Sequence, residues 1–271
     1  MTAFAQAVRA ELTKVFTTRM WWVLAIIMVA YVGFTAVSIG FGLGYATDGA
    51  ESSGFPLEFD LAAMTYSTAV TVGFVFAVLL GALSVTGEYR HQTVTPTFLA
   101  VPQRGVALAA KLTVQYGLGA FYGVLAFVGS VGLGALGLAI SGAGAQLDQA
   151  STWLLILRGI IAMGLWAGIG VGLGALVRNQ VAAIVIVVAF TQFVEPLLRF
   201  GSMINSTAGA IGQFLPGAAS DALVGGSFYS LMMAGGSGSQ LEWWSGGLVL
   251  VAYAVAATIG GYFTSWRKDV T

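Results

Sequence analysis

Residues that could carry chemistry are scarce in this sequence, and their spacing excludes the commonest reactions. The chain has no Cys, and His91 is its single histidine, so thiolate chemistry and a multi-His metal site are excluded. The three lysines, Lys14, Lys111 and Lys268, do not follow the glycine pattern of a Walker nucleotide site, and no HExxH motif is present. No long apolar run holds two Asp residues or pairs a Ser with a His. We therefore expect no catalysis, metal or cofactor in this chain.

Two charged residues, Arg158 and Glu195, lie near the ends of long apolar runs. A charge at mid-membrane costs about 2.5–3.5 kcal/mol on insertion scales, and pairing with an opposite charge offsets part of this cost. We predict that Arg158 and Glu195 form an intramembrane polar pair or share a polar cavity. The alternative is that each side chain extends separately to the lipid headgroups. The following Pro196 predicts a break in the helix, because proline cannot donate the helical hydrogen bond.

The composition predicts the elements that must hold these residues. The chain is 58% hydrophobic and 8% charged, whereas a soluble domain has about 25% charged residues. A surface so poor in charge must face lipid. The apolar runs are continuous rather than alternating, which favours helices over the strands of a barrel. The sequence therefore predicts an all-α, polytopic membrane protein. Its net charge of zero offers no basic surface for nucleic acid.

Six apolar runs are long enough to cross about 30 Å of hydrocarbon as helices. They are residues 20–43, 61–87, 112–147, 153–177, 181–198 and 245–266. The third run is long enough for one tilted span but not for two. Glycines at helical spacing, Gly119 and Gly123 in the third run and Gly168, Gly170, Gly172 and Gly174 in the fourth, predict close helix packing.

The distribution of Lys and Arg predicts the orientation of these spans. If the N-terminus is cytoplasmic, nine of the 11 basic residues lie on the cytoplasmic side, and only Arg158 and Arg199 lie near the outer face. We therefore expect a multi-pass protein of the cell membrane with both termini in the cytoplasm.

Three segments outside the spans divide this single domain of residues 1–271. Residues 1–19 have apolar side chains at helical spacing opposite Arg9, Glu11 and Lys14, which predicts an amphipathic helix on the cytoplasmic membrane surface. This helix is either a simple anchor or an elbow that also touches a partner. The outer segment, residues 199–244, has apolar stretches at 208–215 and 222–234 that are too short to span. They are predicted to be re-entrant or interfacial helices.

Residues 87–105 form the largest polar segment on the predicted cytoplasmic side. Pro96 is suited to the first turn of a short helix, and Pro102 with Gly105 would end it. A short helix with exposed Phe98 and Leu99 suits docking into a groove on another protein. The alternative is an ordinary loop whose apolar residues dip into the membrane.

Residues 87–111, GEYRHQTVTPTFLAVPQRGVALAAK, closely resemble the first cytoplasmic loop of ATP-binding-cassette (ABC) exporter permeases of the second integral-membrane type. These are six-helix half-permeases that are common in actinobacteria. Three further stretches are similar to the same family: AELTKVFTTRMWW at 10–22, GLGALVRNQVAAIV at 172–185 and FVEPLL at 193–198. The resemblance thus follows the whole chain in order, and the first motif is the most specific.

The resemblance implies that two permeases, identical or paralogous, associate and dock two ABC ATPase subunits, which bind ATP and Mg. It implies that the segment from Glu88 to Arg104 is a coupling helix that enters the ATPase, and that the N-terminal helix is a connecting helix beside it. The ATPase-coupling residues carried over are Glu88, Tyr89, Arg90, Thr93, Thr97, Phe98, Leu99, Pro102 and Arg104, together with Glu11 and Lys14. Spans two and five would border the central pathway.

These features predict a permease subunit of an ABC exporter for an amphipathic or apolar substrate, working by alternating access. Two alternatives stay open. One is a membrane scaffold or sensor that binds a cytoplasmic partner and transports nothing. The other is an ion-coupled secondary carrier, which would need acidic residues near mid-membrane, where only Glu195 comes close.

Overall fold

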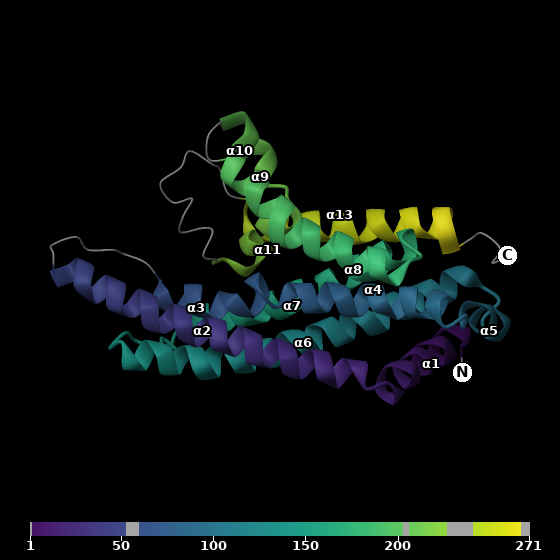
Figure 1. Ribbon diagram of the computed structural model, residues 1–271, viewed down its shortest axis with the longest axis horizontal. Helices are drawn as coiled ribbons and strands as arrows, with labels where there is room; N and C mark the ends of the chain where they lie inside the picture. Colours follow the sequence, from purple (N-terminus) through teal and green to yellow (C-terminus); the bar gives the residue numbers. More distant parts are fainter. Residues whose placement is uncertain (1, 53–59, 203–205, 227–240, 267–271) are drawn as a thin grey trace.

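Helices make up nearly all of the part of the chain that the structure describes, as the continuous apolar runs predict (Figure 1). The computed structural model describes residues 2–52, 60–202, 206–226 and 241–266, and no strand occurs within these ranges. Six helical segments there are long and apolar enough to cross a membrane, in agreement with the six predicted spans. They are Met20–Thr47, Leu61–Arg90, Arg104–Ile140, Ala150–Leu176, Gln180–Gly201 and Trp243–Trp266.

The described helical elements are more numerous than the spans, because three spans are divided into two or more elements and four short helices lie outside the spans. The elements are α1 (Ala3–Thr17), α2 (Met20–Ser52), α3 (Leu61–Thr71), α4 (Phe74–Arg90), α5 (Val94–Ala100), α6 (Arg104–Ile140), α7 (Ala150–Leu176), α8 (Gln180–Ala189), the π-helix η1 (Phe190–Val194), α9 (Glu195–Ser202), α10 (Ser206–Gly212), α11 (Pro216–Val224), α13 (Trp243–Gly261) and the π-helix η2 (Tyr262–Trp266).

The fifth span is interrupted next to its proline, as predicted. Because Pro196 has no backbone N–H, the regular ladder of hydrogen bonds cannot continue through it. The chain forms the π-helical turn η1 just before it, in which the N–H of Glu195 donates to the carbonyl of Phe190. Such single π turns absorb a local mismatch within a helix. This turn sets the direction in which the side chain of Glu195 points from the helix.

The second span differs from the uninterrupted helix expected for residues 61–87. It is divided at Val72 and Gly73 into α3 and α4. A Cβ atom at Gly73 would collide with the carbonyl oxygen of Ala69, so the break needs a residue without a side chain. The glycine lies in a run of apolar residues, and nothing in the run marks this point as a break.

The helices pack closely where their backbones meet at glycines. Helices α4 and α7 contact each other extensively, and so do α2 with α6 and α6 with α7. A Cβ at Gly81 of α4 would collide with the α7 backbone, and one at Gly170 or Gly174 of α7 would collide with the α4 backbone. The prediction of close packing is confirmed at these glycines of α7. Gly168 is the exception, since its nearest neighbour would lie at an ordinary 3.9 Å from the added atom.

The ends of the bundle are unlike each other. Helices α1 and α5 and the end of η2 gather at one end, whereas α9, α10 and α11 lie towards the other (Figure 1). Of the predicted outer segments, the first is present as the short helix α10. Only residues 222–226 of the second are described, and residues 222–224 form the end of α11, which starts at Pro216. Residues 227–234 of that prediction lie outside the described residues.

Candidate functional site

The short helix α5 is present within the polar segment that follows the second span. It begins at Val94, two residues before Pro96, which lies in the first turn where no backbone N–H is needed. It ends at Ala100, and Val101 is extended with φ −129° and ψ 88°, as expected for the residue before a proline. The two prolines therefore limit α5 to seven residues.

A tight turn connects α4 to α5 and fixes the angle between them. Gln92 has a φ of +56°, in the left-handed region that a residue with a side chain rarely adopts. The N–H of Gln92 donates to the carbonyl of Tyr89 at 3.3 Å, and the N–H of Thr93 donates to that of Glu88 at 2.9 Å. These two bonds form a Schellman motif, which stops α4 and starts α5 without a flexible linker.

Two acidic and two basic residues form a charge cluster beside α5, defined as Glu11, Lys14, Glu88 and Lys111. The Lys14 ammonium lies 2.7 Å from Glu11 and 2.6 Å from Glu88, and it also donates to the hydroxyl oxygen of Thr97 on α5 at 3.1 Å. The Lys111 ammonium lies 2.5 Å from Glu11 and 3.1 Å from Glu88. The charge cluster thus ties α1, α4 and α6 together, and Lys14 extends it to α5.

Three of the four members of the cluster, Glu11, Glu88 and Lys111, are buried, so their charges depend on one another. Lys111 is 1% exposed, and both carboxylates are buried. Burial opposes ionisation of Glu11, but the ammonium groups of Lys111 and Lys14 outweigh it and hold the pKa of Glu11 below its usual value. Burial likewise opposes the charge on Lys14, but Glu88 and Glu11 outweigh it and raise the pKa of Lys14. Glu11 and Lys14 are therefore charged near neutral pH.

An aromatic cluster holds α5 from its other side, defined as Tyr89, Phe98 and Trp266. The ring of the fully buried Trp266 lies edge-on to Phe98 at 5.2 Å and to Tyr89 at 6.3 Å between centroids. The indole N–H of Trp266 donates to the backbone carbonyl of Arg104 at 2.9 Å. The Arg104 guanidinium lies over the Phe98 ring, 4.9 Å from its centroid. The end of the last span therefore supports α5.

The predicted site residues divide into an inner group that supports α5 and an outer group that α5 presents. Phe98 belongs to the inner group, so the prediction that it is an exposed docking residue is wrong: its ring is half-buried against Trp266. Leu99, in contrast, is 79% exposed. Thr93 and Pro102 are exposed as well, and Arg90 is exposed with its guanidinium 3.2 Å from the side-chain oxygen of Gln180.

Two residues of this site, Lys111 and Trp266, were missed by sequence reasoning. Lys111 starts an apolar run and looks like a residue that simply flanks a span. A signal was present, because it lies in register with the apolar Ala107, Leu108 and Val114, which face the interior of the bundle. Trp266 looks like one of the tryptophans that mark a membrane interface, and no local pattern shows that it is buried.

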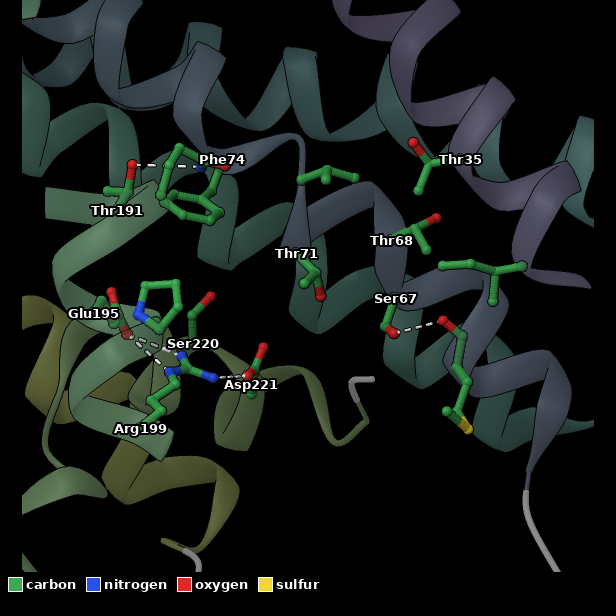
Figure 2. Close-up of a pocket in the computed structure, with 16 residues that line it drawn as sticks. Thr35, Ser67, Thr68, Thr71, Phe74, Thr191, Glu195, Arg199, Ser220 and Asp221 are labelled. Carbon is green, nitrogen blue, oxygen red and sulfur yellow. Dashed lines mark hydrogen bonds and ion pairs between the residues drawn. The ribbon is translucent and has the colours of Figure 1, made fainter. Parts of the chain in front are cut away.

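The predicted pair of Arg158 and Glu195 is wrong. Glu195 is paired with Arg199 at 2.9 Å, one helical turn further along the same helix, and Arg199 is also paired with Asp221 at 2.6 Å (Figure 2). Arg158 lies 4.5 Å from the centre of the Trp243 ring instead. A partner four residues away is positioned by the helix itself, which is why Arg199 takes the place expected for Arg158.

Comparisons with known proteins identify no relative. No model of a known protein family matches the sequence, and no curated protein matches it. Among the described residues, no three His, Asp or Glu side chains lie close enough together to hold a metal ion. The described residues thus place two features at opposite ends of the bundle: a helix held from two sides, and a polar cavity lined by Glu195.

Proposed function

We propose that this chain is the membrane-spanning permease subunit of an ABC exporter. It associates with a second permease and with two copies of a separate ATPase subunit, which binds ATP and Mg. Hydrolysis in the ATPase drives export of an amphipathic or apolar substrate across the cell membrane. Both termini of the permease, α1 and α5 are on the cytoplasmic side. The resemblance of residues 87–111 to the loop of such permeases and the support given to α5 favour this function.

The observation that carries the proposal is the way in which α5 is held. The helix is contacted on one side by Lys14 of the charge cluster and on the other by Trp266 of the aromatic cluster. Between these contacts it presents Leu99, which is 79% exposed. An apolar side chain this exposed at the polar end of a bundle is suited to a groove in a partner.

These contacts define a route for force. A movement of the partner that displaces Leu99 moves α5 as a rigid unit, because the Schellman turn at Gln92 and the prolines restrict its backbone. Lys14 passes the displacement to Glu88 of α4, and Trp266 passes it to the last span. A change in the angle of these spans would expose the substrate alternately to the two sides. The bundle is therefore the element with two conformations, and the position of α5 determines which of the two is favoured.

The test is a substitution on the presented face of α5. Leu99→Asp places a charge where an apolar groove is expected, without touching either supporting cluster. We expect the ATPase subunit that co-purifies with the native chain to be lost from the variant, while expression and membrane insertion stay normal. ATP hydrolysis and export by reconstituted complexes should fall at least tenfold.

Leu147→Asp is the matched control, because Leu147 is an exposed leucine in the loop at the opposite end of α6. This control should retain the ATPase. The proposal is overturned if no ATPase co-purifies with the native chain, or if Leu99→Asp retains both the ATPase and export. A scaffold that transports nothing would retain the partner but show no ATP-dependent export.

A further inference from the structure

A polar cavity of about 250 Å³ lies within the bundle at the end away from α5 (Figure 2). Residues of α2, α3, α9 and α11 line it, including Glu195, Arg199 and Asp221. Phe74 of α4 and residues of η1 also line it, but none of the lining residues belongs to the charge cluster or the aromatic cluster. The cavity is therefore a second site, separate from the one that supports α5.

Four of the six hydroxyl groups that line the cavity already donate their own protons, so they can only accept further hydrogen bonds. Each of the four donates to a backbone carbonyl three or four residues earlier in the chain, at 2.7–2.9 Å. These residues are Thr35, Ser67, Thr68 and Thr191. A hydroxyl that has donated its hydrogen offers only lone pairs to a further partner. The part of the wall that these four residues form is therefore a surface of acceptors.

The carboxylate of Glu195 adds to this surplus of acceptors. Its Oε1 accepts from the Arg199 guanidinium at 2.9 Å and from the N–H of Ala218 at 3.2 Å. Its Oε2 is buried and has no hydrogen-bond partner in the described part of the chain. Glu195 is 3% exposed, so water outside the protein does not satisfy that oxygen. An unsatisfied buried acceptor is unfavourable, and a ligand that brings a donor to it would remove the penalty.

The charges of the residues at this site, like their hydrogen-bonding groups, favour a ligand that is a cation and a hydrogen-bond donor. The two carboxylates of Glu195 and Asp221 share the single guanidinium of Arg199. With all three groups ionised, they carry two negative charges and one positive charge, which favours a positively charged ligand over a negatively charged one.

The remaining wall of the cavity is apolar and includes an aromatic face. Phe74 lines it together with Ile39, Met64 and Val72. The Phe74 ring is itself held in place by stacking on Trp166, at 4.5 Å between centroids. A bare metal ion would gain nothing from this wall, whereas the apolar part of an organic cation would bury its surface there.

We propose that this cavity binds the protonated primary amine of a small amphipathic compound. The ammonium group donates to Glu195 Oε2 and to the threonine and serine oxygens, and the apolar part lies against Phe74. A cavity of about 150 Å³ is enough for benzene, so 250 Å³ accommodates an aromatic ring with a short aminoalkyl chain. That this compound is also the transported substrate rests on the exporter function proposed above.

The test uses the purified full chain in nanodiscs of uncharged lipid, without any ATPase. The probe is phenethylammonium, and the comparison compound is its N,N,N-trimethyl derivative, which has the same charge but no N–H donor. We expect saturable binding of the probe by calorimetry, with at least tenfold weaker binding of the trimethyl derivative. Glu195→Gln should weaken probe binding at least tenfold, whereas Glu242→Gln, at an exposed acidic residue, should not change it.

A second variant guards against misfolding of Glu195→Gln. Thr71 lines the cavity, and Thr71→Val removes its hydroxyl while keeping its shape. Probe binding should weaken about threefold to tenfold. The inference is overturned if the probe does not bind, if Thr71→Val and Glu195→Gln bind it as the native chain does, or if sodium ions alone occupy the site and exclude it. Loss of the ATPase in Leu99→Asp is a separate readout, so either proposal can fail while the other stands.

Discussion

At the scale of single residues, Lys111 carries a buried charge that depends on its ion-pair partners. Its side chain is 1% exposed, and its ammonium group contacts Glu11 at 2.5 Å and Glu88 at 3.1 Å. It also donates to the backbone carbonyl of Ser84 at 3.2 Å. A buried charge is tolerated only while its partners are in place, and the same holds for the two carboxylates that it neutralises.

Lys111→Met should therefore destabilise the protein by roughly 3–5 kcal/mol, the range found when one member of a buried ion pair is removed. The methionine fills a similar volume, but Glu11 and Glu88 are left to share Lys14 alone. The thermal unfolding midpoint in nanodiscs should fall. The double variant Glu11→Gln with Lys111→Met should recover part of the loss. An unchanged midpoint for the single variant would contradict this account of the cluster.

The ionisation of Glu11 and Lys14 gives the docking of α1 a defined pH range. The pKa of Glu11 is lowered from an ordinary 4.5, so its contribution is complete above that value and is lost as the pH falls through the lowered pKa. The pKa of Lys14 is raised from 10.5, so its contribution is complete below that value and is lost as the pH rises through the raised pKa. Helix α1 should therefore stay docked from pH 5 to pH 10.

Spin labels can measure this range, because the native chain has no Cys to interfere. Labels at Gln6→Cys on α1 and Gln103→Cys beside α5 report their separation by pulsed electron paramagnetic resonance. The distance distribution should be constant from pH 5 to pH 10 and broaden below pH 4. In a Glu11→Gln background the transition at low pH should shrink. A transition near neutral pH would show that another group controls α1.

At the scale of elements, the sequence predicts the spans well and their interruptions unevenly. A span needs a long apolar run, and each such run is visible without knowing its neighbours. The break beside Pro196 is also visible, because a missing N–H acts locally. The break at Gly73 is not visible, because the glycine lies in an apolar run, and the burial of Phe98 depends on Trp266, which is distant in sequence. Contacts of this kind have no local signal.

Glycines on α7 offer an element-scale test with an internal control. Gly170→Ala should force α4 and α7 apart, because the added methyl group collides with the backbone at Val78. We expect a loss of roughly 1–3 kcal/mol, typical of overpacking. Gly168→Ala lies two residues away and meets nothing closer than 3.9 Å, so it should be neutral or slightly stabilising. Thermal unfolding of the two variants distinguishes them, and equal midpoints would contradict this packing.

The candidate site shows the same division between local and distant information. The charged residues Glu11, Lys14 and Glu88 are identifiable from the polar segments that contain them. The contact between them cannot be identified from the sequence, because α1, α4 and α6 are brought together by packing within the whole bundle. The Arg158–Glu195 pair failed for the complementary reason: the helix offered Glu195 a nearer partner in Arg199.

At the scale of the whole molecule, the arrangement of spans makes a prediction about sidedness. Within the described residues, three candidate spans separate Leu99 from Glu242: Arg104–Ile140, Ala150–Leu176 and Gln180–Gly201. An odd number of crossings places these two exposed residues on opposite sides of the membrane. Helix α11 does not alter the count, because its nine residues extend about 14 Å, far less than the roughly 30 Å of hydrocarbon.

The absence of native Cys lets single introduced thiols report their side directly. In intact cells, a charged maleimide that does not cross membranes should label Glu242→Cys and leave Leu99→Cys unreacted. Permeabilised cells should show labelling of both. The excess of Lys and Arg on the α5 side sets this direction. If both thiols react in intact cells, then one candidate span does not cross, and α5 is on the wrong side to meet an ATPase that works in the cytoplasm.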